Sequence, residues 1–414
     1  MKIYQVGGAV RDKLLDRPSK DKDWVVVGAT PNQLLELGYT PVGQDFPVFL
    51  HPTTHEEYAL ARTERKIKPG YTGFNVYAAE DVTLEEDLQR RDLTINAMAL
   101  DNDGQLIDPF NGLKDLRAGI LRHVSPAFTE DPVRILRVAR FTARFDFSIA
   151  KETLALMIKM VKQGEVDALV AERVWQETVR ALSESQPQKF FEMLRSCGAL
   201  ARLFPEIDNL FGVPQSAKHH PEIDTGKHVM LCLQQARLKT NDTKVLFAVL
   251  THDLGKGTTP PEQYPKHINH EERGIELIDA LCQRYRVPKQ HYHLAVLVAR
   301  YHTYCHQITT LSPETVLETL QNLDAFRRPQ RFEQFLMAAE ADSRGRSGFA
   351  NQPYPQAEQF RRAYEIACQV KVASVLADGF QRMAIGKELH RRRVQALELI
   401  WANTNQASCI FMPQ

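Results

Sequence analysis

The stretch from Lys2 to Val27 constrains the fold of this chain more than any other. It begins with an apolar run, Ile3–Val6, continues through Gly7 and Gly8, and enters a segment that carries Arg11. This order predicts a strand, a tight turn and a short helix, because glycine allows unusual backbone dihedrals and a close approach of other groups. The positive end of such a helix attracts phosphate.

Two carboxylates, Asp21 and Asp23, lead into the next apolar run, Trp24–Val27. Because they stand two apart on an extended segment, their side chains point to the same side and can hold divalent cations between them. Paired cations that clamp the attacking and leaving oxygens are a recurring solution for nucleotidyl transfer. Either motif alone is more often a turn or a solvated edge, but the combination predicts this chemistry.

The composition narrows the class of protein. With 414 residues, 43% hydrophobic and 25% charged, the chain has room for two to four domains of an ordinary globular protein. No apolar run of membrane-spanning length and no signal-peptide pattern occur, so we expect no membrane partner. Six scattered cysteines without a C-x-x-C pair predict a reducing, cytoplasmic location. A net charge of +1 argues against indiscriminate coating of nucleic acid and leaves RNA contacts to local basic patches.

The periodicity of the chain changes near residue 125. Before it, short β-rich runs predict a small mixed sheet of about five strands; after it, the pattern is helical to the end. The predicted strands are Ile3–Val6, Trp24–Val27, Val48–Leu50, Tyr58–Ala61 and Gln105–Ile107. The fold class is therefore α+β, a compact head followed by an all-helical body.

Arg91 and Asp92 precede a segment, Leu93–Leu100, whose apolar residues fall at helical spacing and predict an amphipathic helix. Taken alone, the two charges form a surface ion pair of little energetic value. A fixed guanidinium fork such as that of Arg91 also suits phosphate oxygens.

A second motif, Glu130–Phe141, places arginines 134, 137 and 140 on one stripe of a predicted helix. Three such charges repel one another unless an anion lies between them. Asp131 can accept a hydrogen bond from an exocyclic amino group and Arg134 can donate to a ring nitrogen or carbonyl. C and A both carry that amino group, whereas U and G present different edges.

Ten of the 14 histidines fall between His219 and His306. Within this region the adjacent His252 and Asp253 favour a metal site, because imidazole and carboxylate together bind first-row divalent metals. The bound metal acidifies a water for attack on phosphate. His270 and His302 are additional candidates as ligands or phosphate contacts, while other histidines are read as ordinary surface or core residues: His219, His220, His291 and His293.

Together the motifs G-G-x-V-R-D, D-x-D-W, R-R-D and E-D-x-x-R resemble those of polymerase-β-type nucleotidyltransferases, and specifically the bacterial class II CCA-adding tRNA nucleotidyltransferases. The H…HD…D pattern resembles the HD phosphohydrolases. The resemblance implies a Mg²⁺-dependent head that adds C, C and A to the 3′ end of tRNA from CTP and ATP without a nucleic-acid template.

The resemblance also implies roles for single residues. Asp21 and Asp23 would hold the Mg²⁺ ions, with Glu57 or Glu56 as an undecided third carboxylate. The nucleotide would contact Gly8, Arg11, Arg91, Asp131, Arg134, Arg137 and Arg140. In the HD part, a transition-metal cation such as Ni²⁺ would bind His228, His252, Asp253 and Asp342 and support 2′,3′-cyclic phosphodiesterase, 2′-nucleotidase and phosphatase activities.

The expected domains are a head at 1–125, a nucleotide-selecting and RNA-binding helical region at 126–220, an HD domain at 221–330 and a helical tail region at 331–414. Two alternatives remain open. One is a poly(A) polymerase, or an enzyme that adds only CC or only A; the other is an HD phosphohydrolase whose head merely binds RNA. Whether the protein is a monomer or a homodimer is left undecided.

Overall fold

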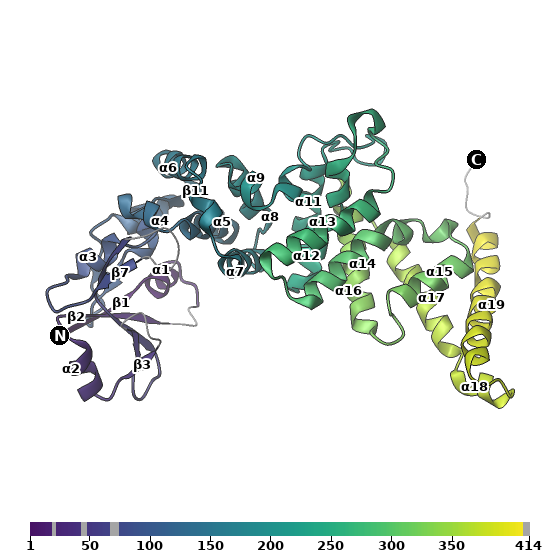
Figure 1. Cartoon of the computed structure of the whole chain (residues 1–414), viewed down its shortest axis with the longest axis horizontal. Helices are drawn as coiled ribbons and strands as arrows, with labels where there is room; N and C mark the ends of the chain where they lie inside the picture. The colour runs from purple at the N-terminus through teal and green to yellow at the C-terminus, as the bar shows by residue number, and fades with distance from the viewer. Residues whose placement is uncertain (19–21, 43–47, 67–73, 409–414) are drawn as a thin grey trace. The chain divides into compact units, whose positions relative to one another are not determined.

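The computed structural model describes residues 1–18, 22–42, 48–66 and 74–408 (Figure 1). The chain divides into two compact units, residues 1–204 and residues 205–414. The first combines a sheet with helices, and the described part of the second is built of helices. The predicted α+β class, with a small mixed sheet before a helical body, is confirmed.

The sheet of the first unit has seven strands among the described residues. All neighbours are antiparallel except β2 and β5, which run parallel. In spatial order the strands are β3 (Thr40–Val42), β4 (Val48–Leu50), β5 (Glu57–Leu60), β2 (Asp23–Val27), β1 (Lys2–Val6), β8 (Ala99–Leu100) and β9 (Leu106–Ile107). All five predicted strands are present, and β3 and β8 are additional.

The amphipathic helix predicted over Leu93–Leu100 is wrong. The structure has a 3₁₀ turn at Thr94–Asn96 and then strand β8, which pairs with β1. Every residue from Asp92 to Leu100 is buried. A segment buried on all sides does not carry the one-sided pattern that distinguishes a helix from a strand.

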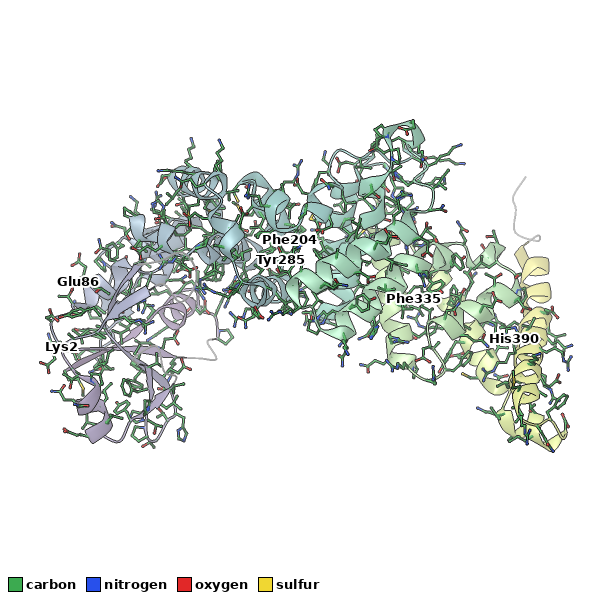
Figure 2. The ribbon with its side chains drawn as sticks, in the orientation of Figure 1. Lys2, Glu86, Phe204, Tyr285, Phe335 and His390 are labelled. Atoms are coloured by element: carbon green, nitrogen blue, oxygen red, sulfur yellow. The ribbon has the colours of Figure 1, made fainter. Side chains whose placement is uncertain are left out.

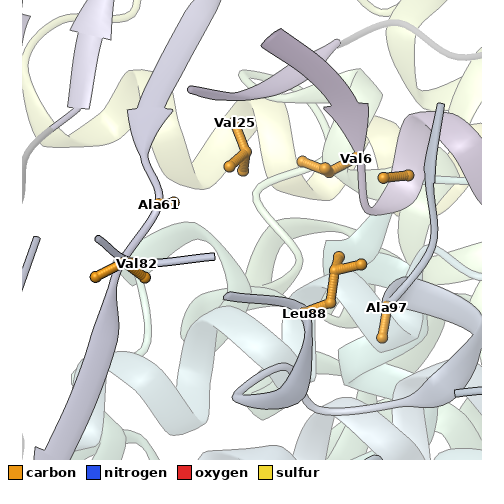
Figure 3. Packing of buried hydrophobic residues seen from close by; sticks show 7 residues of the cluster. Val6, Val25, Ala61, Val82, Leu88 and Ala97 are labelled. Carbon is orange, nitrogen blue, oxygen red and sulfur yellow. The ribbon is translucent and has the colours of Figure 1, made fainter. Parts of the chain in front are cut away.

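The two faces of the sheet pack against separate hydrophobic clusters. Successive side chains of a strand point to opposite faces, so neighbouring Val25 and Val26 of β2 enter different clusters. The Val25 cluster contains Val6, Leu88 and Ala97 (Figure 3). Val6 of this cluster is the last residue of β1 and directly precedes Gly7, which leads into α1 (Gly8–Leu14).

The first unit contains eight further α-helices among its described residues. Two short strand pairs accompany them, an antiparallel hairpin of β6 (Thr63–Lys66) with β7 (Phe74–Tyr77) and a parallel pair of β10 (Ile120–Leu121) with β11 (Ser148–Ile149). The helices are α2 (Pro31–Glu36), α3 (Leu84–Gln89), α4 (Gly112–Ala118), α5 (Val133–Phe145), α6 (Lys151–Lys162), α7 (Ala171–Leu182), α8 (Gln188–Ser196) and α9 (Ala199–Leu203).

The second unit is a helical assembly in which α11, α12, α14 and α16 pack on one another and α13 packs on α14. Phe335 of α16 is fully buried among them (Figure 2). The helices are α10 (Pro205–Asp208), α11 (Thr225–Lys239), α12 (Thr243–Thr251), α13 (His270–Tyr285), α14 (Lys289–His306), α15 (Pro313–Asn322), α16 (Pro329–Arg344), α17 (Pro355–Gln369), α18 (Val372–Ala377) and α19 (Met383–Ser408). None of the described helices is long and apolar enough to cross a membrane.

Candidate active sites

The turn between β1 and α1 is built around Gly7. Its φ of 70° lies in the region that side chains disfavour, and a Cβ there would stand 2.9 Å from Nη1 of Arg91 and 3.7 Å from Oδ2 of Asp23. Gly8, the predicted contact, starts α1 and would place a Cβ no closer than 3.4 Å to Arg11. Gly7 is therefore the residue that lets the predicted metal-binding and nucleotide-binding side chains approach each other.

Asp23 begins β2 and pairs in register with Glu57 of β5, and both line one cavity. Glu56 instead accepts a hydrogen bond of 2.9 Å from Nε1 of Trp24. The structure thus places Glu57, not Glu56, beside Asp23. Both carboxylates are exposed, and hard oxygen donors open to water fit Mg²⁺, which keeps several water ligands. Asp21 lies outside the described residues.

The cavity beside these carboxylates has a volume of about 540 Å³. Every predicted nucleotide contact lines it: Gly8, Arg11, Arg91, Asp131, Arg134, Arg137 and Arg140. Nine arginines line it in all, against four carboxylates. Such a surplus of guanidinium groups attracts a polyanion such as a triphosphate.

Carboxylates from other parts of the first unit hold two arginines of α5 in place. Nε of Arg137 donates to Asp92 at 2.7 Å, and Nε of Arg140 donates to Glu177 at 2.7 Å. Burial alone would raise the pKa of Asp92, but the charge of Arg137 and hydrogen bonds from Asn96 and Arg137 hold it well below its ordinary value. The expected repulsion along the stripe is thus relieved inside the protein itself.

Arg91 and Asp92 do not form the ion pair with each other that their adjacency suggests. Nη2 of Arg91 donates to Asp87 at 3.1 Å, while Asp92 binds Arg137. Arg11 donates to Asp12 and Asn96 and lies over the ring of Phe145 at 4.9 Å. Each of these guanidinium groups is therefore oriented before any ligand arrives.

Asp131 and Arg134 each have a partner that sequence reasoning missed. Arg173 of α7 holds both carboxylate oxygens of Asp131, at 3.1 and 2.8 Å. Arg134 donates to the backbone carbonyls of Ala127 at 2.9 Å and Arg90 at 2.6 Å. Nothing in the sequence near Arg173 signals this contact.

In the second unit the four predicted metal ligands come together from three places in the chain. His228 lies on α11, His252 and Asp253 follow α12, and Asp342 lies on α16. Nε2 of His228 is 2.9 Å from Oδ1 of Asp342, and Nε2 of His252 is 3.2 Å from Oδ2 of Asp253. All four are at most 6% exposed.

The histidines of this cluster are oriented as metal ligands require. Nδ1 of His252, His270 and His302 lies 2.7 to 2.9 Å from a backbone carbonyl, which assigns its proton there and leaves Nε2 as an acceptor. Among the described groups, Nε2 of His252, Nε2 of His270 and Oδ1 of Asp253 are buried without a hydrogen-bond partner. Burial lowers the pKa of His270 to about 4 and that of His302 to about 3, so both stay neutral. The residues present therefore fit a divalent cation.

Several groups around this cluster were not predicted. Glu222 accepts from Nδ1 of His228 at 2.8 Å, and Nζ of Lys256 donates to Asp253 at 2.7 Å. Nε2 of His306 donates to Oδ2 of Asp342 at 2.7 Å, and its Nδ1 lies 2.8 Å from the hydroxyl of Tyr354. The concentration of histidines was the only signal in the sequence, and it did not single out His306.

A cavity of about 530 Å³ opens beside the cluster. Asp342, His270 and His302 line it, together with the cationic side chains of Lys256, Lys266 and Arg346. Of the histidines read as ordinary, His219 and His220 line this cavity, and His291 instead bonds Thr243 at 3.0 Å. Cations around a buried His/Asp cluster suit a phosphorylated ligand.

Comparison with protein families and known proteins assigns these features to a family. Models of a poly A polymerase head domain, of a probable RNA- and SrmB-binding site of polymerase A and of an HD domain match residues 3–122, 146–211 and 225–336. Two solved structures share the fold at 20% identity. A CCA-adding enzyme with ATP has a TM-score of 0.66 over 100% of this chain and 91% of that chain. A Thermotoga maritima CCA-adding enzyme complexed with tRNA has a TM-score of 0.62 over 97% and 91%.

A curated multifunctional CCA protein from Nitrosococcus oceani is 63% identical over 398 residues, which are 96% of this chain and 98% of that protein. Identity of this extent spans both the sheet-containing unit and the helical unit. The chain is thus an enzyme of the multifunctional CCA protein family, in which a polymerase-type nucleotidyltransferase head is joined to an HD domain.

Proposed function

We propose that the first unit adds and repairs the CCA sequence at the 3′ end of tRNA from CTP and ATP, without a nucleic-acid template. The observation that carries this proposal is the 540 Å³ cavity, in which Asp23 and Glu57 line the same space as Asp131 and Arg134. Nucleotide addition without a nucleic-acid template needs carboxylates that bind the metal and protein groups that recognise the base. The relatives' name and the tRNA and ATP complexes of similar folds support it.

In the proposed reaction Asp21 and Asp23 would hold Mg²⁺, and the bound cation would make the terminal 3′-hydroxyl of the tRNA more acidic and neutralise the departing pyrophosphate. Glu57 supports Asp23 from the neighbouring strand. Gly8, Arg11 and Arg91 bind the triphosphate, and Arg137 and Arg140 add positive charge near the nucleotide. Because these arginines are already oriented by carboxylates, little ordering is left for the moment of binding.

Asp131 and Arg134 select the base in this proposal. The carboxylate accepts from the exocyclic amino group of C or A, and the guanidinium donates to the adjacent ring nitrogen. A carbonyl oxygen of U or G at the same place would face a carboxylate and be rejected.

The test is incorporation of labelled CTP, ATP, GTP and UTP into tRNA that lacks its 3′ end. The wild-type protein is expected to add C, C and A alone, Asp23→Ala to add nothing, and Asp253→Ala to add as the wild type does. Long runs of A would show a poly(A) polymerase, and addition of only CC or only A a partial enzyme. A wild-type protein that adds nothing but hydrolyses phosphodiesters would leave the head as an RNA-binding module.

For the second unit we propose 2′,3′-cyclic phosphodiesterase, 2′-nucleotidase and phosphatase activities at the HD cluster. A first-row cation such as Ni²⁺, held by His228, His252, Asp253 and Asp342, would acidify a water and polarise the phosphate. Nζ of Lys256 donates to Asp253 at 2.7 Å, and the cationic cavity wall would hold the RNA end. Loading metal-free protein with Mg²⁺, Mn²⁺, Co²⁺, Ni²⁺ or Zn²⁺ tests this, with bound metal and hydrolysis of 2′,3′-cyclic AMP as readouts.

The proposed location is the cytoplasm. The five described cysteines form no disulfide, in keeping with a reducing compartment. The protein would act as a monomer or a homodimer.

A further inference from the structure

Arg173 and Asp131 form a bidentate ion pair in the first unit. Arg173 lies in the first turn of α7, and its Nη1 and Nη2 donate to Oδ1 and Oδ2 of Asp131 at 3.1 and 2.8 Å. The side chains are 26% and 19% exposed, and both line the nucleotide cavity. A two-pronged contact of this kind fixes the plane of the carboxylate as well as its position.

The hydrogen bonds of Asp131 leave room for one more donor. Oδ1 accepts from Arg173 and from the backbone N–H of Val133 at 3.1 Å, and Oδ2 accepts from Arg173. A carboxylate oxygen accepts about two hydrogen bonds. Judged by the contacts of the described residues, Oδ2 of Asp131 is thus the oxygen that can accept one more hydrogen bond.

Arg134 is the nearest competitor for this carboxylate. It lies in the first turn of α5, just after Asp131, and its backbone N–H donates to the backbone carbonyl of Asp131 at 3.0 Å. In the structure its guanidinium is turned to the carbonyls of Ala127 and Arg90, while Asp131 is turned to Arg173. Each of the two proposed base-reading groups thus has a partner of its own.

We propose that Arg173 is a positioning residue for base selection. It holds Asp131 with one acceptor lone pair directed at the cavity and prevents the carboxylate from turning to Arg134. Without it, Asp131 and Arg134 would satisfy each other and read the base poorly. This inference rests on the proposed selection of CTP and ATP by these two residues.

The chain offers a matched control. Arg202 and Asp167 form a second two-pronged arginine–aspartate pair in the same unit, with Nε of Arg202 2.8 Å from Oδ1 of Asp167. Neither residue lines the nucleotide cavity. Replacing Arg202 removes the same kind of interaction without touching the proposed base-reading groups.

The experiment measures kcat and KM for CTP, ATP, UTP and GTP with wild type, Arg173→Ala, Arg173→Lys and Arg202→Ala on tRNA lacking its 3′ end. We expect Arg173→Ala to raise KM for CTP and ATP and to lower the preference for CTP over UTP about tenfold, because a charged hydrogen-bond partner is lost. The preference of Arg173→Lys for CTP over UTP should lie between those of wild type and Arg173→Ala, since one ammonium group cannot hold both carboxylate oxygens. Arg202→Ala should keep the wild-type preference.

Equal losses with all four nucleotides, or the same loss of preference in Arg202→Ala, would overturn the proposal and leave Arg173 a purely structural residue. If Arg173→Ala does not fold, the ratio of CTP to UTP use in Arg173→Lys against Arg202→Lys decides in the same way. A wild-type enzyme that adds no C and A to tRNA would instead overturn the proposed function, whatever the variants do.

Discussion

The nucleotide cavity of the first unit and the histidine cluster of the second handle charge in opposite ways. In the cavity the metal-binding candidates Asp23 and Glu57 are exposed, and Arg137 and Arg140 are held by carboxylates from other parts of the unit. In the cluster the candidate ligands are at most 6% exposed, and Nε2 of His252, Oδ1 of Asp253 and Nε2 of the neighbouring His270 are buried without a hydrogen-bond partner.

This difference in exposure indicates how firmly each site would hold its metal. A cation bound by exposed carboxylates can exchange with cations in the solvent. The cation of the first site can therefore arrive and leave with a nucleotide. Buried polar atoms without partners cost free energy unless a ligand satisfies them, so we expect the cation of the second site to be resident. The predictions below test this contrast in order of expected effect.

The largest effect is expected from Asp253→Asn. Asp253 is 1% exposed and lies within 3.7 Å of three imidazoles, so its charge is central to metal binding. We expect metal content to fall to background and hydrolysis of 2′,3′-cyclic AMP to fall on the order of a thousandfold. Metal analysis and hydrolysis assays check this, with CCA addition by the same variant as the control. Retained metal would contradict the idea of a resident cation.

A smaller effect is expected from Glu57→Gln in the open site. Glu57 pairs in register with Asp23, whereas Glu56 is bonded to Trp24. Nucleotide addition by Glu57→Gln should fall roughly a hundredfold and recover in part at high Mg²⁺, because charge near the metal is lost. Glu56→Gln is the matched control and should stay within a few-fold of wild type. The reverse order of the two variants would exclude Glu57 as the third carboxylate.

Glu222→Gln sharpens the contrast further, because Glu222 lies behind His228 without belonging to the predicted ligand set. Its carboxylate accepts from Nδ1 of His228 at 2.8 Å and from the backbone N–H of Ser347 at 3.0 Å. Loss of such a partner typically weakens metal affinity about tenfold or somewhat more. Titration of the metal-free protein with Ni²⁺ or Co²⁺ measures this change, and an unaltered affinity would show that Glu222 serves only the local fold.

The smallest effect is expected from Gly7→Ala and concerns the free energy of unfolding. At Gly7, φ is 70° and a Cβ would stand 2.9 Å from Arg91, whereas Gly8 allows ordinary helical geometry. We expect Gly7→Ala to lower stability by about 1–2 kcal/mol and to slow nucleotide addition, and Gly8→Ala to cost less than about 0.5 kcal/mol. Urea unfolding of both variants checks this, and equal losses would show that the turn does not need a left-handed residue.

Much of the fold could be predicted from the sequence, and the prediction that was wrong has a physical explanation. Short strands flanked by turns, such as Asp23–Val27, carry a local apolar pattern that predicts them. The segment from Asp92 to Leu100 does not, because it is buried throughout and its pattern fits a helix as well as a strand. Strand β8 exists because β1 offers it an edge to pair with, and that edge is tertiary.

The sequence by itself determined which chemical groups the protein has and in what order: two aspartates before a buried strand, arginines on a stripe, and histidines with aspartates in the helical body. Only the tertiary structure decided their partners. Asp131 meets Arg173 over 42 residues, Asp92 meets Arg137 over 45, and Asp342 meets His306 over 36. Such contacts depend on how separate elements pack, because a charged side chain leaves no periodic trace of the residue that it will neutralise.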